Sequence, residues 1–423
     1  MRKSLGSLLA LIFLIVPLLA ACGGAAASPP TSAPVAPTVA PVAEATTAPT
    51  DAPTSAPTAA ATAAPTTAAA TVAPTTAAAT AAPTAASGTA IDPTTLKVGL
   101  VTDLGKVNDG TFNEFAHEGV LAAQKEAAFE YKFIETTAQA DYEKNVQTFV
   151  DEGYDVIVTV GFLIADVTKA SAAANPEITY IGVDQFYEPG AVTDNLLGLQ
   201  FREDQAGFLA GALAAMMSES GTIGIVAGLE IPPVKKFKNG YDNGAQYVRP
   251  DINLLGVYLP SFVDPALGGS TAEQMIGEGA DVIFGAGGPT GTGAIKAAAE
   301  NGTFVIGVDQ DEYVTTFAGG TAPGADKILS SASKRVDVAV ATAIGDLIKG
   351  TFKGNGIVVL DAAGNGVGLA DFHDAEAAIP DGVKAKLDEI FAALADGSLN
   401  TGVDPASGDV IEAEVPEANP YTP

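Results

Sequence analysis

Cysteine, histidine and tryptophan are nearly missing from this chain of 423 residues, which has one cysteine, two histidines and no tryptophan. A lone cysteine, Cys22, cannot form an intramolecular disulfide, so packing alone must hold the core together. The histidines, His117 and His373, belong to no cluster of metal-ligating residues, and the turn DLGKVNDG does not match the alternating acidic pattern of a calcium loop. We expect neither a disulfide scaffold nor a metal centre.

Basic residues are also scarce: 21 Lys and Arg stand against 50 Asp and Glu, a formal net charge of -29. A protein that binds nucleic acid needs a basic face to neutralise phosphates, so nucleic acid is not an expected partner. Motifs for phosphate binding and nucleophilic catalysis are missing too. There is no GxxxxGK[ST] loop and no GxSxG elbow, and the glycine-rich run GAGGPTGTG lacks a strict GxGxxG spacing.

The first 22 residues have the pattern of an export signal. Arg2 and Lys3 precede an apolar stretch that ends in LAAC at Cys22. This ending resembles a bacterial lipobox, in which the cysteine is lipidated and becomes the mature N-terminus. The stretch is short for a membrane span. We therefore expect residues 1–22 to be a lipoprotein signal peptide, and the protein to be extracytoplasmic and anchored to the bacterial cell membrane by lipid at Cys22.

Residues 23–92 consist mainly of Ala, Pro and Thr, in repeats such as ATAAPTTAAATVAPTTAAATAAPT. This composition offers no apolar face to bury, so no packed core is expected there. Frequent proline favours extended conformations of roughly 3 Å per residue, and we interpret the segment as a disordered tether. At the other end, the acidic stretch 403–423 is expected to be a disordered tail with no assigned role.

Residues 93–402 alternate short apolar runs with helical stretches, a pattern typical of α/β proteins with parallel sheets. Runs such as LKVGLVT, DVIVTV and TIGIVAG predict buried strands, and SKRVDVAVATAIGDLIKG predicts a helix. The two halves of this region also repeat each other, since ITYIGVDQFYE matches TFVIGVDQDEY. The same offset, 125 residues, separates Phe112 from Phe237 and Asp184 from Asp309. The repeat predicts two similar α/β lobes.

Two similar lobes imply a ligand cleft between them. We place lobe 1 at about 93–200, with a return segment after about 320, and lobe 2 at about 201–320. Ligands of open parallel sheets bind beyond the C-terminal ends of the strands, so both lobes would direct those ends towards one cleft. Acidic residues and glycines follow the predicted strands at these ends: Asp103, Gly161, Asp184, Gly285 and Asp309.

Binding without catalysis is the hypothesis that these residues favour. Carboxylates accept hydrogen bonds from hydroxyl and amide groups, and aromatic rings stack on flat ligands. Phe112 and Phe262 each stand beside a polar residue in different lobes, although a core position for either is equally open. The pair Asp309 and Asp311 could perform acid–base chemistry, but hydroxyl recognition or simple solvation suits a strand-end loop better.

The segment LVTDLGKVNDGTFNEFAHEGV resembles the signature of the basic membrane protein family, TDxGxxxDxSFNxxxxxG, with Thr111 in place of the usual Ser. The resemblance continues through FREDQAGFLAGALAA, YLPSFVDPALG, GADVIFGAGG, VIGVDQDEY, SSASKRVDVAV and GNGVGLADF. Members of this family are substrate-binding lipoproteins of ABC importers, and its best-understood branch resembles PnrA, a purine nucleoside receptor. The resemblance implies a type I periplasmic-binding-protein fold, with two Rossmann-like lobes that close about a hinge on the ligand.

The resemblance also implies a site for the base of a nucleoside. Phe112 and Phe262 would hold a purine ring between them. Asp103 and Asn113 would make polar contacts around the base and the sugar, and Phe162 is a further candidate that the resemblance supports less directly. The second copy of this turn, AGLEIPPVKKFKNGY, lacks both the acid and the TFN sequence, so it is expected to be scaffold.

Residues for the sugar are implied in the same way. Asp309 and Lys334 would bind the ribose hydroxyls, and Asp184 is a weaker candidate. Gly285 and Gly287 would let the backbone approach the ligand closely. Without a phosphate-binding loop or a nearby excess of cations, the implied ligand is a neutral nucleoside rather than a nucleotide.

The function that follows from the resemblance is transport and not catalysis. The protein is expected to be a monomer without a cofactor, which delivers a nucleoside to ABC permease and ATPase subunits. Two alternatives remain open. One is a surface sensor or a receptor for another small neutral ligand, such as a sugar or a signal molecule. The other is a nucleoside hydrolase that uses Asp309 and Asp311.

Overall fold

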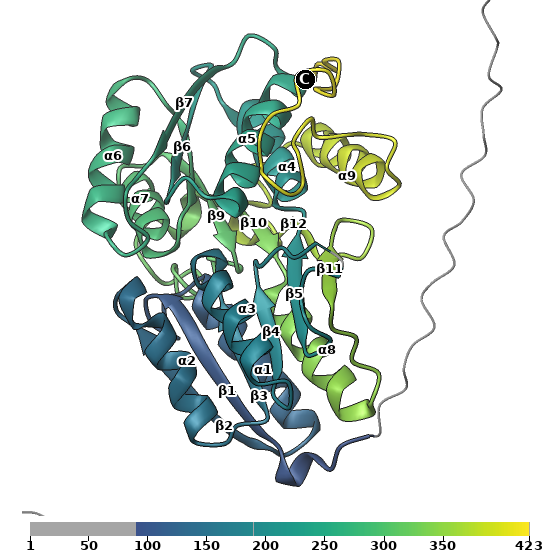
Figure 1. Ribbon diagram of the computed structural model, residues 1–423. Helices are drawn as coiled ribbons and strands as arrows, with labels where there is room; N and C mark the ends of the chain where they lie inside the picture. The colour runs from purple at the N-terminus through teal and green to yellow at the C-terminus, as the bar shows by residue number, and fades with distance from the viewer. Residues whose placement is uncertain (1–89, 189, 423) are drawn as a thin grey trace, which may run out of the picture. The chain divides into compact units, whose positions relative to one another are not determined.

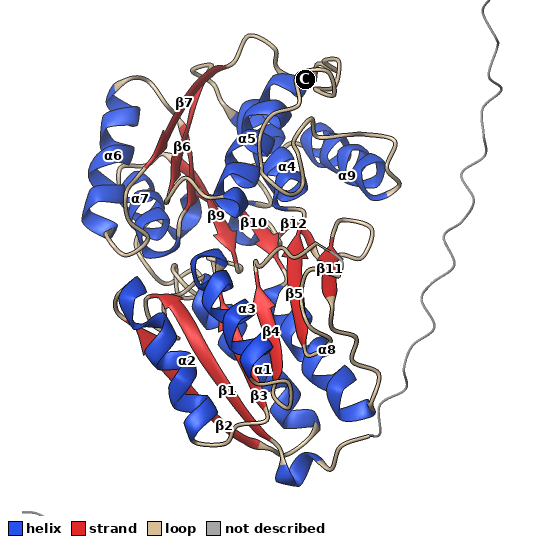
Figure 2. Cartoon of the chain, viewed as in Figure 1, coloured by secondary structure: helices blue, strands red, loops and turns tan. Residues whose placement is uncertain are grey.

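The computed structural model describes residues 90–188 and 190–422 (Figure 1). The predicted signal peptide, the lipidation residue Cys22 and nearly all of the predicted tether lie outside these ranges. Within them, helices and strands alternate along the chain, as Figure 2 shows. No helix in the described ranges is both long enough and apolar enough to cross a membrane.

The first lobe contains a six-stranded sheet in the order β11-β5-β4-β3-β1-β2, in which neighbouring strands are parallel. Its strands are β1 (Lys97–Leu104), β2 (Glu130–Thr136), β3 (Val156–Val160), β4 (Thr179–Val183), β5 (Leu196–Phe201) and β11 (Gly356–Leu360). Its helices are α1 (Phe112–Glu126), α2 (Tyr142–Asp151), α3 (Ala165–Ala174) and α8 (Val336–Lys349).

The second lobe contains a six-stranded sheet in the order β12-β10-β9-β8-β6-β7, parallel except for β12. Its strands are β6 (Thr222–Ala227), β7 (Asn253–Tyr258), β8 (Val282–Ala286), β9 (Phe304–Asp309), β10 (Ile328–Lys334) and β12 (Val367–Leu369). Its helices are α4 (Glu203–Met217), α5 (Pro232–Val248), α6 (Pro265–Gly277), α7 (Gly288–Glu300) and α9 (Asp381–Ala395). Short 3-10 turns are η1 (Pro93–Thr95), η2 (Gln139–Asp141), η3 (Phe162–Ile164), η4 (Ala325–Lys327) and η5 (His373–Ala375).

The two sheets have matching strand orders, as the sequence repeat predicts: β1, β3 and β4 occupy the places of β6, β8 and β9. A glycine recurs at the same point of β1 and β6 because a helix side chain packs closely on the strand there. A Cβ at Gly99 would lie 2.7 Å from the ring of Phe149 in α2, and one at Gly224 would lie 2.8 Å from the sulfur of Met275 in α6. The predicted α/β fold with two parallel-sheet lobes is confirmed.

The described chain passes between the lobes three times: from β5 to α4, from β10 to α8, and from β11 to β12. The return to lobe 1 begins after Lys334 rather than at about 320, because β10 pairs in parallel with β9 and extends the second sheet. The return also ends with β11, and the chain from β12 onward rejoins lobe 2. The three crossings form the hinge region between the lobes.

The C-terminal residues 403–422 are ordered, so the expectation of a disordered tail is wrong. The backbone N–H groups of Asn419 and Tyr421 donate to the carbonyl oxygens of Tyr247 and Val248 at the end of α5, at 2.8 and 2.9 Å. An acidic composition predicts that side chains are exposed, but it does not predict whether backbone N–H groups bond to the end of a distant helix. The tail is therefore part of lobe 2.

Candidate ligand site

A cavity lies between the lobes, at the C-terminal ends of the parallel strands. Four carboxylates and four phenylalanine rings line it, with Lys334 as the single cation among the lining residues. The charged and aromatic lining residues are Asp103, Asp109, Phe112, Phe162, Asp184, Phe237, Phe262, Asp309 and Lys334.

The structure brings nine of the ten residues implied by the resemblance to this cavity: Asp103, Phe112, Asn113, Phe162, Asp184, Phe262, Gly287, Asp309 and Lys334. The exception is Gly285, which does not line it. A Cβ at Gly285 would overlap the carbonyl oxygen of Gly291 in α7. This glycine therefore lets α7 pack against β8, which is a structural role outside the cavity lining.

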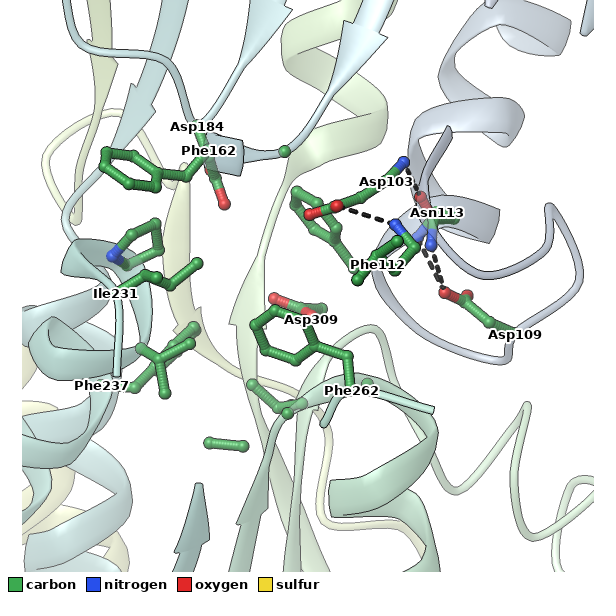
Figure 3. Close-up of a pocket in the computed structure, with 18 of the residues that line it drawn as sticks. Asp103, Asp109, Phe112, Asn113, Phe162, Asp184, Ile231, Phe237, Phe262 and Asp309 are labelled. Atoms are coloured by element: carbon green, nitrogen blue, oxygen red, sulfur yellow. Dashed lines mark hydrogen bonds between the residues drawn. The ribbon is translucent and has the colours of Figure 1, made fainter. Parts of the chain in front are cut away.

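Aromatic rings from four separate segments surround the cavity (Figure 3). Phe112 begins α1, Phe162 begins η3, Phe237 belongs to α5, and Phe262 lies between β7 and α6. Phe112 and Phe262 come from different lobes, as a ring held between them would require. Flat ligands stack on such faces with little dependence on their substituents.

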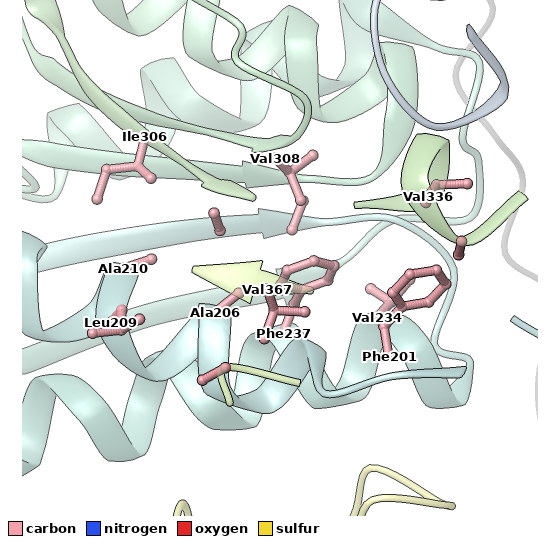
Figure 4. Packing of buried hydrophobic residues seen from close by; sticks show 14 of the residues in the cluster. Phe201, Ala206, Leu209, Ala210, Val234, Phe237, Ile306, Val308, Val336 and Val367 are labelled. Carbon is pink, nitrogen blue, oxygen red and sulfur yellow. The ribbon is translucent and has the colours of Figure 1, made fainter. Parts of the chain in front are cut away.

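The first turn of α5 forms a wall of the cavity, which corrects the expectation that the second copy of the repeated turn is scaffold. Ile231, Pro233, Val234 and Phe237 all line the cavity. Figure 4 shows that Val234 and Phe237 also belong to the buried core beside Val308. The 125-residue offset from Phe112 to Phe237 was a usable signal for this position.

The acidic turn before α1 is held by its own side chains, as the dashed lines in Figure 3 show. The Asp103 N–H donates to Asn113 Oδ1 at 2.9 Å, and Asn113 Nδ2 donates to Asp109 Oδ2 at 2.9 Å. The Asp109 carboxylate also accepts from the backbone N–H groups of Thr111 and Glu114, at 3.0 and 3.1 Å. Asn113 and Asp109 thus brace the turn and the start of α1, and this presents Phe112 and Asp103 to the cavity.

Asp103 is buried, and its Oδ1 accepts hydrogen bonds from the Tyr142 hydroxyl and from the Leu104 N–H. Burial raises the pKa of Asp103 to about 6, against the lowering effect of these two hydrogen bonds. Gly161 lies against the same carboxylate, with φ of +100° and no room for a Cβ. Asp103 therefore contributes a desolvated acceptor at the end of β1.

Lys334 is the centre of a buried chain of ion pairs that crosses the hinge. Its Nζ lies 2.6 Å from Asp184 Oδ2 and 3.0 Å from Glu203 Oε1, and Glu203 Oε2 lies 2.5 Å from Lys236 Nζ. Burial alone would lower the pKa of Lys334, but the carboxylates around it, Asp184 first, hold that pKa above its ordinary value. Lys334 therefore stays charged, and its ammonium also lies 4.8 Å from the centre of the Phe112 ring.

Asp184 and Asp309 occupy equivalent strand ends in the two lobes, both with left-handed backbone conformations, at φ of 61° and 64°. The Oδ1 atoms of both side chains are buried and have no hydrogen-bond partner among the described residues. Burial raises the pKa of Asp309 to about 7, and nearby Lys334 lowers it only in part. An unpaired buried acceptor is costly, so a hydroxyl donor from a ligand would stabilise the site.

Two hydrogen bonds join the lobes on the side of the cavity occupied by the acidic turn. Gln310 Nε2 donates to the Thr111 carbonyl at 2.8 Å, and Thr315 Oγ1 donates to the Gly110 carbonyl at 2.9 Å. Sequence reasoning missed both donors, and the repeat gives no signal for Gln310. Gln185, the counterpart of Gln310, bonds only within its own lobe, to Thr159 and Gly161.

Asp311 is not beside Asp309 in the cavity. Its Oδ2 lies 2.6 Å from His373 Nε2, and the His373 ring stacks on Tyr313 with centroids 4.2 Å apart. The paired carboxylates that a hydrolase would use are therefore not brought together. His117 bonds to the Tyr131 hydroxyl at 2.7 Å, and no group of three metal-ligating side chains occurs in the described part of the chain.

Two lobes of equal topology with a cavity between them define a solute-binding protein of the periplasmic-binding-protein fold. A solute-binding protein of an ABC transporter system from Aeropyrum pernix K1 matches with a TM-score of 0.65 and 30% identity, over 72% of this chain and 92% of that one. A second, from Conexibacter woesei, matches the fold with a TM-score of 0.60 at 21% identity, over 74% of this chain and 99% of that one.

Sequence comparison shows the family to which the chain belongs. The model of the PnrA-like ABC transporter substrate-binding proteins matches residues 96–389, and the chain belongs to this family. The ABC transporter nucleoside-binding protein BmpA of Lactococcus lactis is 32% identical over 70% of this chain and 88% of its own length. Basic membrane protein A of Borreliella burgdorferi is 34% identical over 62% of this chain and 75% of its own length. Membership implies a small-molecule ligand and partner permease and ATPase subunits, and the family consists of binding proteins rather than enzymes.

Proposed function

We propose that this protein binds a nucleoside, with a purine base, between its lobes and delivers it to an ABC permease. The observation that carries the proposal is the cluster of Asp309, Lys334 and Asp184 beneath aromatic walls from both lobes. The name of the Lactococcus lactis relative, a nucleoside-binding protein, supports the same ligand class.

A ribose diol suits the polar end of the cavity. The Asp309 Oδ1 atom is buried and unpaired among the described residues, so it can accept a hydrogen bond from one hydroxyl. The Lys334 ammonium has three N–H donors, and Asp184 and Glu203 take two of them. The third can donate to a neighbouring hydroxyl oxygen. A carboxylate beside an ammonium thus matches a vicinal diol and needs no phosphate.

A flat base suits the aromatic end of the cavity. Phe112 and Phe262 approach from opposite lobes, and stacking on aromatic rings contributes about 1–3 kcal/mol per base. The Asp103 carboxylate at the end of β1 can accept from an N–H group on the base edge. Closure of the lobes would bring these groups together around the ligand.

The charge of the cavity supports a neutral ligand. Asp103, Asp184 and Asp309 line it against one lysine, and the carboxylates already neutralise that lysine. A phosphate group would bring further negative charge into this environment without a cation to bind it. Nucleosides are therefore expected to bind much more tightly than nucleotides.

The cellular role follows from the same proposal. Lipidation at Cys22 would hold the protein on the extracytoplasmic face of the cell membrane, and residues 23–89 would tether the binding lobes at a distance from it. The protein would act as a monomer, and the site needs no second copy since one chain contains both walls of the cavity.

Native mass spectrometry of the purified protein tests the proposed ligand without a prior choice of nucleoside. We expect an added mass that equals one purine nucleoside, lost when the protein is unfolded and dialysed. A co-purified sugar, or a mass that corresponds to a nucleotide, would contradict the proposal.

A further inference from the structure

A C-terminal loop contacts α5, the helix that forms one wall of the ligand cavity, on a face that does not line the cavity. Residues 401–411, which we call the C-terminal strap, lie beyond the family match of 96–389. Lys235 Nζ forms an ion pair with Asp409 Oδ1, and Asn239 Nδ2 donates to the Gly408 carbonyl at 2.6 Å. Both contacts join the strap to the N-terminal half of α5.

The strap and the tail beyond it follow one face of α5. The residues of α5 that they contact recur every fourth position, and helix residues with this spacing lie on the same face. Asn243 Nδ2 donates to the Thr401 carbonyl at 2.8 Å, and the Tyr247 carbonyl accepts from the Asn419 N–H at 2.8 Å. The contacting residues of α5 are Lys235, Asn239, Asn243 and Tyr247.

The tip of the strap fits against the first turn of α5. Gly408 has a φ of +76°, and a Cβ there would lie 2.7 Å from the Pro232 carbonyl oxygen and 2.9 Å from the Lys236 backbone nitrogen. Only a glycine permits this approach. Any side chain at this position would push the strap and the helix turn apart.

The start of α5 has no side-chain cap of its own. Ile231 precedes the helix and provides no side-chain cap for it. The other faces of this turn meet the ligand cavity through Val234 and Phe237, and the hinge through the ion pair between Lys236 and Glu203. The strap holds the remaining face of the helix start, through Lys235, Asn239 and the close approach of Gly408.

The other end of the strap is tied to the hinge. Thr401 Oγ1 donates to Asp204 Oδ2 at 2.6 Å, at the start of α4, where the chain enters lobe 2 from β5. Arg202 forms an ion pair with the same carboxylate at 2.6 Å. One short segment thus connects the first hinge crossing to the wall of the cavity.

We propose that the C-terminal strap is a positioning element for the ligand site, which holds the first turn of α5 so that Val234 and Phe237 present a fixed wall to the ligand. This proposal rests on the proposed nucleoside function for its ligand, and its structural part can be measured without any ligand.

The test compares two glycines with the same backbone conformation in the full chain. Gly408→Ala places a methyl group against α5, whereas Gly397→Ala, also at φ of +76°, has nothing within 4 Å. Both substitutions carry the same left-handed strain, so a loss of stability common to both cancels in the comparison. Amide hydrogen exchange of residues 234–237 and calorimetric titration with a purine nucleoside are measured for both variants.

We expect Gly408→Ala to speed exchange at 234–237 and to weaken nucleoside binding at least about fivefold, while Gly397→Ala changes neither. A second pair covers the case in which Gly408→Ala does not fold. Asn239→Asp, which repels the Gly408 carbonyl, should weaken binding, whereas Asn419→Ala at the far end of the tail should not.

Unchanged exchange in Gly408→Ala and Asn239→Asp would overturn the proposal, and so would faster exchange with unchanged nucleoside affinity. Failure of the unsubstituted protein to bind any nucleoside is a different result. It would contradict the proposed function, and the exchange comparison would still show whether the strap restrains α5.

Discussion

Substitution of Asp309 by Asn should move ligand binding and the stability of the ligand-free protein in opposite directions. The carboxylate is buried, with one unpaired oxygen, and burial raises its pKa from 3.8 to about 7. Each pKa unit corresponds to about 1.4 kcal/mol, so the charged side chain destabilises the ligand-free protein by up to roughly 4 kcal/mol at pH 8. Asp309→Asn removes this cost but also takes a favourable neighbour from Lys334. The substitution should therefore raise the free energy of unfolding at pH 8 by a smaller amount, about 1–3 kcal/mol.

The sign of the pH dependence follows from the raised pKa. Between pH 4 and 7 the folded protein retains a proton on Asp309 that the unfolded chain has lost, so the stability of the unsubstituted protein falls over this range. Asp309→Asn removes that loss. Urea denaturation should therefore give similar free energies of unfolding for both proteins near pH 4, and a more stable variant at pH 8.

The same variant should bind the nucleoside with a dissociation constant roughly ten- to a hundredfold higher, because a charged acceptor for a hydroxyl is lost. This corresponds to about 1.5–3 kcal/mol of binding free energy. Asp311→Asn is the matched control, since Asp311 bonds to His373 outside the cavity and should leave affinity unchanged. A variant that is no more stable at pH 8, or that binds the nucleoside as before, would refute the reasoning.

Three further predictions follow from the cavity and the hinge. Phe262→Ala should weaken nucleoside binding at least about tenfold in calorimetry, through lost stacking, with the circular dichroism spectrum unchanged. Lys334→Met should lower the free energy of unfolding at pH 8 by about 3–5 kcal/mol in urea titrations, because Asp184 and Glu203 lose their buried partner; equal stability would contradict the ion-pair chain. Gln310→Ala should raise the nucleoside dissociation rate severalfold in stopped-flow measurements by removing a bond between the lobes, whereas exposed Gln274→Ala should not. An unchanged dissociation rate for Gln310→Ala would show that this bond does not hold the lobes closed.

The architecture was predictable because it repeats along the chain. The 125-residue offset relates strands that occupy equivalent places in the two sheets. The repeated hydrophobic pattern therefore predicted that both sheets have the same strand order. Residues at the C-terminal ends of strands, such as Asp103 and Asp309, reach the cavity for a general reason: parallel strands direct these ends to one edge.

Features that depend on pairing between distant segments were not predictable in this way. Strand β12 has only three residues, too few to show the alternating hydrophobic pattern of a strand. Its place in the sheet is set by antiparallel pairing with β10. The C-terminal tail is acidic in composition but is ordered by contacts with α5. The chain leaves the second lobe for the first after Lys334 rather than near 320, because β10 is part of the second sheet.

Within the site, the errors have individual causes. Gly285 and Gly287 are two residues apart, but only Gly287 lines the cavity, since Gly285 faces α7. Phe237 was assigned to scaffold because its surrounding motif differs from that of Phe112, whereas its position in the repeat was the better guide. Side-chain bonds across the lobes, such as that of Gln310, leave no pattern in a single sequence.

Isothermal titration calorimetry with paired ligands tests the central claim most directly. Adenosine, guanosine and inosine would each be titrated into the ligand-free protein beside the corresponding 5′-monophosphate. We expect saturable binding of at least one purine nucleoside at one site for each chain, and binding of its monophosphate at least about a hundredfold weaker, since four carboxylates line the cavity beside a lysine that is already paired. No binding of any nucleoside, or equal affinity for nucleoside and monophosphate, would contradict it.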